Sequence, residues 1–328
     1  MKAINILAMA ALATAVFASC SSEDELAQNN YPMDNVVRIM TSVDGMNTRA
    51  SYGNSTDKLS SFGFCINNAN NTTYTYDNVK VTKENGNWNP ATQMLWQNST
   101  TAVDILAYAP FQETTEDASG NVTVFGKKDY AFSVKADQSG ADDYSSDLIV
   151  YKQTEFTPKS NLNTNQAVNV AFTHLLSQLN LAIELRDQFN QDGKTVTAAT
   201  VTDVKVNGTI ISSKVDFSVA SIWVQVDGTQ ATAITPETTR FTPAENATGH
   251  AAFNYSAIVI PQTVAAGNFS ISFKVDGTDY IWTATDAVTF ESGKKHELLL
   301  LVGKDVVQGG TISATSWGNG GTGSLETD

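Results

Sequence analysis

The sequence predicts an all-β protein built from two tandem β-sandwich domains. Its 328 residues exceed the length of one ordinary sandwich and are enough for two domains that each bury a core of their own. Thr, Val, Asn, Ser and Gly are plentiful and only 16% of the residues are charged, which favours strands joined by polar turns over helices. Short apolar segments bounded by turn residues recur along the chain, as two stacked sets of strands require.

These segments form two series, separated by a polar stretch at residues 158–166. The strands expected in the first series lie near residues 59–66, 74–82, 102–108, 122–125, 130–134 and 148–151. Those expected in the second lie near residues 168–172, 179–185, 199–206, 222–226, 255–260, 269–275, 279–283 and 296–302. Because domain boundaries fall in polar segments, we expect an N-terminal domain at residues 50–165 and a C-terminal domain at residues 166–328.

The turns between strands carry their own signals. Asn85-Gly86, Asn207-Gly208 and Asp276-Gly277 are pairs that tolerate the positive φ of a tight hairpin, so each predicts a hairpin. Residues 172–179 have apolar side chains at a spacing that also fits a helix. The flanking residues alternate, however, and we therefore prefer two strands joined by a turn that contains His174.

The start of the chain predicts export. Lys2 precedes an apolar run at residues 4–17, which is too short to span a membrane, and residues 1–19 therefore indicate a signal peptide. The Ala18-Ser19-Cys20 sequence that ends this segment resembles a bacterial lipobox, in which Cys20 would carry lipid; an ordinary signal with an incidental cysteine is the alternative. A lipidated Cys20 would leave Cys65 as the only thiol, so no disulfide is expected within the chain.

Residues 20–49 predict a tether followed by one strand. A polar stretch follows Cys20, and then Val37, Ile39 and Val43 share one face of an alternating segment. The strand is followed by turn-rich residues with a single basic side chain, Arg49, in a position where we expect a protease to have access.

No pattern in the sequence predicts catalysis, a cofactor or a metal site. The three histidines, at positions 174, 250 and 296, are far apart and form no zinc-spaced pair, and no Gly-x-Ser-x-Gly or phosphate-binding sequence is present. The net charge of −14 is spread without a basic stripe, which argues against a nucleic-acid partner. The acidic residues 137–147 would suit calcium by ligand type, but they match no EF-hand, and a solvated loop is the preferred interpretation.

The tryptophans are candidates either for the core or for a sugar-binding platform. Trp223 and Trp282 lie within predicted strands and are expected in the core, whereas Trp88 and Trp96 flank a turn.

Several short segments, in this order along the chain, together resemble the fimbrillin family of Bacteroidales pilus subunits. Besides the lipobox ending at Cys20, they are 47–50 (NTRA), 95–96 (LW), 107–110 (AYAP), 147–150 (DLIV), 172–179 (FTHLLSQL), 260–262 (IPQ), 290–294 (FESGK) and 312–317 (ISATSW). The resemblance implies two transthyretin-like Greek-key sandwiches, outer-membrane lipoprotein export through Cys20, and maturation by a trypsin-like, arginine-specific protease. That cut would fall between Arg49 and Ala50.

In this family, the cut releases the first strand, and the exposed groove accepts a strand from a neighbouring subunit. The resemblance therefore implies that Val37, Ile39 and Val43 belong to a removable strand, and that other pilus subunits are partners in a cell-surface fimbrium. The segment with Ile312, Ala314 and Trp317 is the candidate donor strand, although it alternates only weakly. Both a stalk subunit and a tip or adhesive subunit fit. A non-polymerising surface lipoprotein that binds a glycan or host ligand is the alternative.

Overall fold

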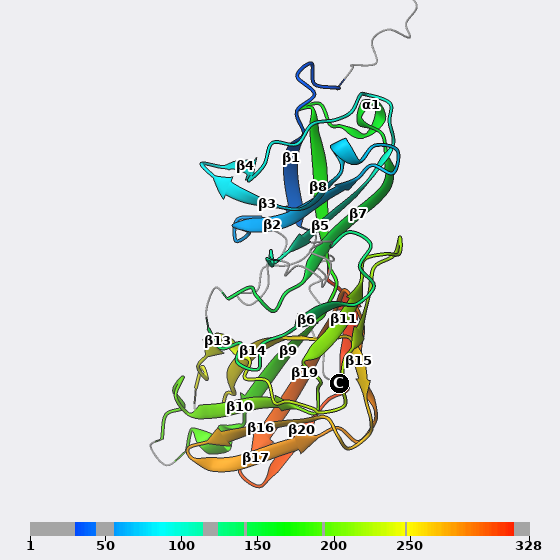
Figure 1. Ribbon diagram of the computed structural model, residues 1–328. Helices are drawn as coiled ribbons and strands as arrows, with labels where there is room; N and C mark the ends of the chain where they lie inside the picture. Colours follow the sequence, from blue (N-terminus) through cyan, green and yellow to red (C-terminus); the bar gives the residue numbers. More distant parts are fainter. Residues whose placement is uncertain are drawn as a thin grey trace, which may run out of the picture.

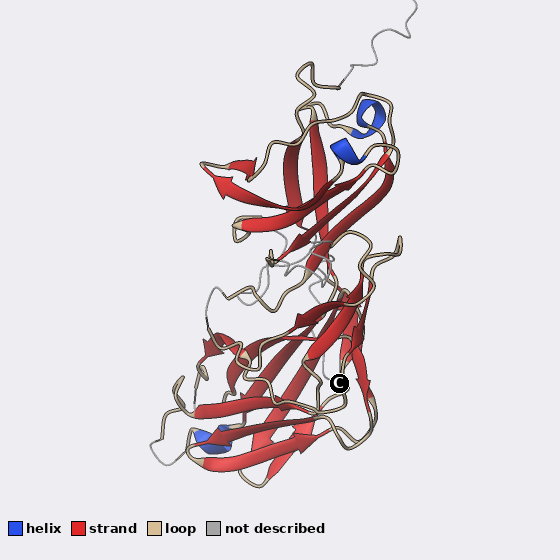
Figure 2. Cartoon of the chain, in the orientation of Figure 1, coloured by secondary structure: helices blue, strands red, loops and turns tan. Residues whose placement is uncertain are grey.

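The computed structural model describes residues 30–43, 56–113, 124–140, 143–191, 194–246 and 248–317. The predicted signal peptide, Cys20, Arg49 and Ala50 lie outside these ranges. Figure 1 shows two β-rich units stacked along one axis, and Figure 2 shows that strands make up nearly all of the regular structure. The predicted all-β class is confirmed. No helix within the described ranges has the length and apolar character needed to cross a membrane.

The first unit is a single seven-stranded sheet in the order β1-β8-β7-β5-β2-β3-β4. Its strands are β1 (Arg38–Val43), β2 (Ser61–Asn67), β3 (Tyr76–Glu84), β4 (Asn87–Pro90), β5 (Val103–Ala109), β7 (Ile149–Phe156) and β8 (Ala167–His174). Short helical turns lie at Thr72–Tyr74 and, as α1, at Pro158–Asn161.

This sheet folds over on itself where β7 meets β8. The two strands share only two residue pairs, Ile149 with His174 and Val150 with Thr173, so they diverge after a short contact. The fold brings β8 over β2, where the rings of Phe62 and Phe172 lie edge to face with centroids 5.4 Å apart. The buried residues alternate along β8, as period-two side-chain orientation requires, and they enclose one apolar core.

The second unit places one large sheet against smaller ones. The large sheet has the order β13-β14-β9-β19-β20, and β21 also pairs with β19. Its strands are β9 (Ser177–Leu185), β13 (Glu237–Thr242), β14 (Ala251–Val259), β19 (Lys294–Gly303), β20 (Val306–Gly309) and β21 (Ser313–Ser316). The central pair, β9 and β19, is parallel over eight residue pairs.

Three small sheets complete the second unit, in the orders β10-β16-β17, β12-β11-β6 and β15-β18. Their strands are β6 (Tyr130–Ser133), β10 (Val201–Asn207), β11 (Ser212–Asp216), β12 (Trp223–Val226), β15 (Gln262–Val264), β16 (Ser270–Val275), β17 (Thr278–Thr283) and β18 (Val288–Phe290). A short helical turn lies at Asp187–Phe189. Both the large and the small sheets contribute to one buried apolar cluster.

Strand pairing does not follow the expected division at residue 165. β8 follows that boundary in sequence but pairs with β1 and β7 of the first unit. β6 precedes it but pairs with β11 of the second unit. The pairing therefore favours a boundary in the turn at Leu175 and Leu176, between β8 and β9, with β6 crossing over.

Two of the three predicted hairpins are confirmed. Asn85-Gly86 joins β3 to β4 and Asp276-Gly277 joins β16 to β17, with positive φ at all four residues. The hairpin predicted at Asn207-Gly208 is wrong, because β10 pairs with β16 and β11 pairs with β6 and β12. Gly208 still has φ +95, but the turn carries the chain from one sheet to another.

Two further expectations can be compared with the structure. The preference for two strands over a helix at residues 172–179 is confirmed, since β8 ends at His174 and β9 begins at Ser177. The turn itself consists of Leu175 and Leu176, so the expectation that it contains His174 is wrong. The expectation that Trp223 is a core residue is wrong. Trp223 begins the edge strand β12 and is 43% exposed, because only β11 pairs with this strand. Trp282 packs partly buried against the core.

Candidate functional site

Strand β1 lies at the edge of the first unit's sheet, beside β8 (Figure 1). The two strands are parallel in a six-pair register that runs from Arg38 opposite Ala167 to Val43 opposite Phe172. On its other side, the chain just before β1 makes two backbone hydrogen bonds: Val37 N–H donates to Met94 O (3.0 Å), and Trp96 N–H donates to Asn35 O (2.8 Å). Among the described strands, β1 itself has only β8 as a ladder partner.

The inner face of β1 is buried in the core of the first unit. Val37 and Ile39 are 3% and 8% exposed and belong to the same apolar cluster as Val168 and Val170 of β8. The backbone of Val43 pairs with Phe172, while its side chain lies outside the described part of the structure. The alternation inferred from the sequence thus places two of the three predicted residues against β8.

Few polar contacts attach β1 and its flank to the rest of the unit. The amide of Asn30 donates to Leu162 O (3.1 Å), and the amides of Asn163 and Asn165 lie 3.4 and 3.3 Å from Met40 Sδ. The salt bridge between Arg38 and Asp34 (2.7 Å) is local and exposed. Apolar burial and the ladder to β8 therefore supply most of the attachment, and neither depends on a covalent bond or a buried ion pair.

The predicted donor segment is paired within its own chain. β21 pairs antiparallel with the first half of β19, so that Ala314 lies opposite His296, and the Ala314 side chain is exposed. Ile312 packs partly buried against the core of the second unit. Trp317 ends the segment and is 3% exposed, with its backbone N–H donating to Gly293 O (3.1 Å).

Trp317 is held by a buried cluster at the junction of the two units. Its ring stacks on His174 with centroids 3.9 Å apart and an interplanar angle of 2°. His174 Nδ1 lies 2.9 Å from Asp147 Oδ1, and both of these side chains are fully buried. Asp147 and His174 are 27 positions apart, and no local sequence pattern predicts their pairing.

Hydroxyl groups near His174 in the sequence donate to backbone carbonyls. Thr173 Oγ1 donates to Val150 O (3.3 Å), and the Ser177 hydroxyl donates to the carbonyl of Glu291 (2.6 Å), which follows β18 in the second unit. His174 ends β8 and stacks on Trp317, so the contacts seen here are packing contacts.

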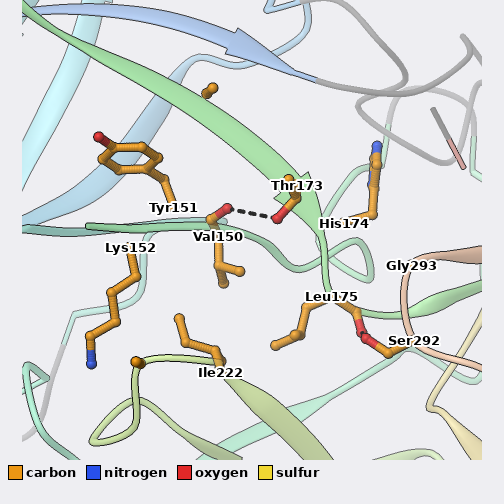
Figure 3. A pocket seen from close by; sticks show the side chains of 11 residues that line it. Val150, Tyr151, Lys152, Thr173, His174, Leu175, Ile222, Ser292 and Gly293 are labelled. Atoms are coloured by element: carbon orange, nitrogen blue, oxygen red, sulfur yellow. Dashed lines mark hydrogen bonds between the residues drawn. The ribbon is translucent and has the colours of Figure 1, made fainter. Parts of the chain in front are cut away.

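An open hollow of about 350 Å³ lies beside this cluster (Figure 3). β7 and β8 of the first unit line it together with Ile222, Ser292 and Gly293 of the second. The amine of Lys152 is committed to backbone carbonyls, donating to Phe217 O (2.5 Å) and Val219 O (3.0 Å), and burial lowers its pKa. Figure 3 also shows the hydrogen bond from Thr173 Oγ1 to Val150 O (3.3 Å). The two hydrogen bonds of Lys152 join β7 of the first unit to the segment that follows β11 in the second.

Two carboxylates of the acidic loop, Asp137 and Asp143, make separate local contacts. Asp137 accepts from the backbone and hydroxyl of Ser139, while Asp143 accepts from Ser145 and pairs with Lys135. Within the described ranges, no group of three His, Cys, Asp or Glu residues could hold a metal ion. The arrangement is that of a loop stabilised by its own side chains.

The fold and this site define a two-unit β-sandwich protein whose most distinctive feature is an edge strand held by apolar contacts. A family model described as fimbrillin-like matches residues 48–317 of the sequence. The chain therefore belongs to the fimbrillin-like family, and the resemblance noted from its motifs is confirmed. Membership places it among fimbrial proteins of the cell surface. Among curated proteins, none matches the sequence.

Solved structures with the same fold come from Bacteroides. A putative cell adhesion protein from Bacteroides uniformis has 20% identity and a TM-score of 0.57 over 87% of this chain and 99% of that one. Another from Bacteroides ovatus has 13% identity and a TM-score of 0.61 over 86% and 97%. A fimbrial protein from Bacteroides vulgatus has 16% identity and a TM-score of 0.51 over 86% and 99%. At these identities the likeness supports a common fold.

Proposed function

We propose that this chain is a pilus subunit that assembles by protease-triggered donor-strand exchange. A trypsin-like, arginine-specific protease cuts between Arg49 and Ala50, the segment that contains β1 leaves, and a strand of a neighbouring subunit takes its place. The observation that carries the proposal is the position of β1: it is an edge strand beside β8, and the side chains of Ile39 and of Val37, which directly precedes β1, are buried in the core of the first unit.

The physical reason for replacement is the surface that β1 covers. Without β1, the N–H and C=O groups along one side of β8 lose their partners, and the apolar side chains of Val168, Val170 and Phe172 lose their cover on that side. An unpaired edge of this kind binds another strand by main-chain hydrogen bonds, while alternate side chains entering the core give specificity. Such a contact joins two different surfaces, so repeated contacts build a filament rather than a closed ring.

Before the cut, Cys20 would hold the chain in the outer membrane through lipid. The polar stretch that follows Cys20 supports this role, because its composition is that of a spacer between an anchor and the first strand. Cleavage then both frees the subunit from the membrane and opens its groove, so that a single cut couples release to assembly.

The C-terminal segment favours a tip or adhesive position over a stalk position. To act as donor, β21 would have to leave β19, and Trp317 would have to leave its stack on His174. A subunit that accepts a strand but keeps its own C-terminal strand would end a filament.

The experiment treats the purified full-length chain with an arginine-specific protease. We expect a cut after Arg49 and, with a partner subunit present, oligomers that survive electrophoresis without boiling. The Arg49→Ala variant should stay full length and monomeric. Normal oligomers from that variant would refute the junction, and unfolding of the first unit on cleavage, with no strand able to restore it, would refute strand replacement.

A further inference from the structure

The third inward position of β1 is occupied by Thr41, which suits its surroundings less well than Val37 and Ile39 do. Thr41 lies opposite Val170 in the parallel ladder. Paired residues of neighbouring strands share a face of the sheet, so its side chain enters the same core. On β8, Val168, Val170 and Phe172 are all 0% exposed, and the surroundings of Thr41 on this side are therefore apolar.

No hydrogen bond offsets the burial of the Thr41 hydroxyl away from water. Its Oγ1 atom is buried and forms no hydrogen bond. Burying a hydroxyl without a partner costs free energy, whereas a valine of nearly the same shape would not incur that cost. β1 therefore covers its groove with two well-matched side chains followed by one that is mismatched.

We propose that Thr41 makes β1 a weakened occupant, and that the groove selects a strand from a different subunit with Val or Ile at this position. The inference rests on the proposed strand exchange and names the partner's chemistry: apolar side chains at alternate positions, including the one that Thr41 fills. The mismatch favours exchange. A strand with Val or Ile at this position does not bury an unpaired hydroxyl, so it binds the groove without the free-energy cost that Thr41 incurs.

A second copy of this chain offers a poorer strand than β1 itself. In its C-terminal segment, the alternate residues are Ile312, Ala314 and Ser316, which supply one large apolar side chain, one methyl group and one hydroxyl. Small or polar side chains would leave space or an unpaired group beside Val170 and Phe172. The occupant that fits is therefore a strand of another subunit.

The test measures competition for the groove. Full-length protein is cut after Arg49 and incubated with fluorescent peptides of residues 35–44, and binding is followed by anisotropy. One peptide has the natural sequence, one carries Thr41→Val, and a matched control carries Ser42→Val at the neighbouring exposed position. A fourth peptide spans residues 308–317.

We expect the Thr41→Val peptide to bind about tenfold more tightly than the natural one, and the Ser42→Val peptide to bind within about twofold of it. The peptide of residues 308–317 should bind more weakly than all three. Equal affinity of the natural and Thr41→Val peptides would overturn the inference and leave strand exchange intact, as would tighter binding of the C-terminal peptide. If no peptide enters the groove at any concentration, strand exchange and the inference both fail.

Discussion

Val37 and Ile39 are the two residues whose burial holds β1 in its sheet. Replacing Ile39 by Ala removes buried methyl groups and leaves a cavity, so we expect the unfolding free energy of the first unit to fall by about 2–4 kcal/mol. Denaturant unfolding measures this change. Met40→Ala is the matched control, because Met40 is 43% exposed on the opposite face and its loss should cost much less. Equal losses would mean that β1 does not face the core.

We expect His296 to make the second unit sensitive to acid. Its Nε2 accepts a hydrogen bond from Glu291 N–H (3.3 Å), and its Nδ1 is buried without a partner. Burial lowers the pKa of His296 below the ordinary value of 6.5. The unfolded chain therefore takes up a proton at a higher pH than the folded chain, and stability is retained above about pH 6.5 and lost as the pH falls through the lowered value.

The test replaces His296 by Gln, which retains a hydrogen-bond acceptor but does not titrate. We expect the fall in melting temperature between about pH 7 and about pH 5 to be smaller in this variant than in the natural protein. An identical fall in the His296 variant would contradict the assignment.

At the scale of elements, β21 is fixed mainly at its end. Its own four side chains are exposed, and Trp317 provides the buried anchor. Trp317→Ala should lower the unfolding free energy by about 3–5 kcal/mol and remove hydrogen-exchange protection from residues 313–316. Trp223→Ala is the control, since Trp223 is 43% exposed. Unchanged protection of β21 would show that its ladder to β19 is enough to hold it.

Two turns with similar sequences differ in what surrounds them. An added Cβ at Gly208 would lie 2.1 Å from Asn268 O, whereas at Gly277 it would meet no atom within 4 Å. Both residues have positive φ, which costs a non-glycine residue about 1 kcal/mol. We therefore expect Gly277→Ala to cost about 1 kcal/mol in thermal unfolding and Gly208→Ala to cost clearly more. Equal costs would show that the backbone at Asn268 yields easily.

Position in the sheet explains why only one of these turns was predicted correctly. Asp276-Gly277 joins neighbouring strands, so local turn chemistry decides the structure. Asn207-Gly208 has the same local chemistry, but β10 and β11 find other partners far away in the sequence. Local signals specify the bend, while the pairing depends on which distant strands bury the same face.

At the scale of the whole molecule, there are two apolar clusters, and β1 contributes to only one of them. The other cluster contains the core of the second unit and also Cys65, Leu106, Tyr108 and Val150 of the first. Cutting after Arg49 and removing the released segment should therefore lower the stability of the first unit and leave the core of the second intact. We expect the calorimetric trace to show a second, lower transition that is absent from the uncut protein. A single transition that shifts as a whole would mean that β6 and the contacts of Lys152 make the two units one cooperative unit.

The sequence by itself determined the all-β class, most strand positions, the apolar face of β1 and the family, because alternation and turn residues act over a few positions. Only the tertiary structure decided that β1 pairs in parallel with β8, that β6 crosses into the second unit, and that Asp147, His174 and Trp317 meet in one buried cluster. Each of these depends on contacts between residues far apart in the chain. Such contacts form where two surfaces bury each other best, and no local pattern records that choice.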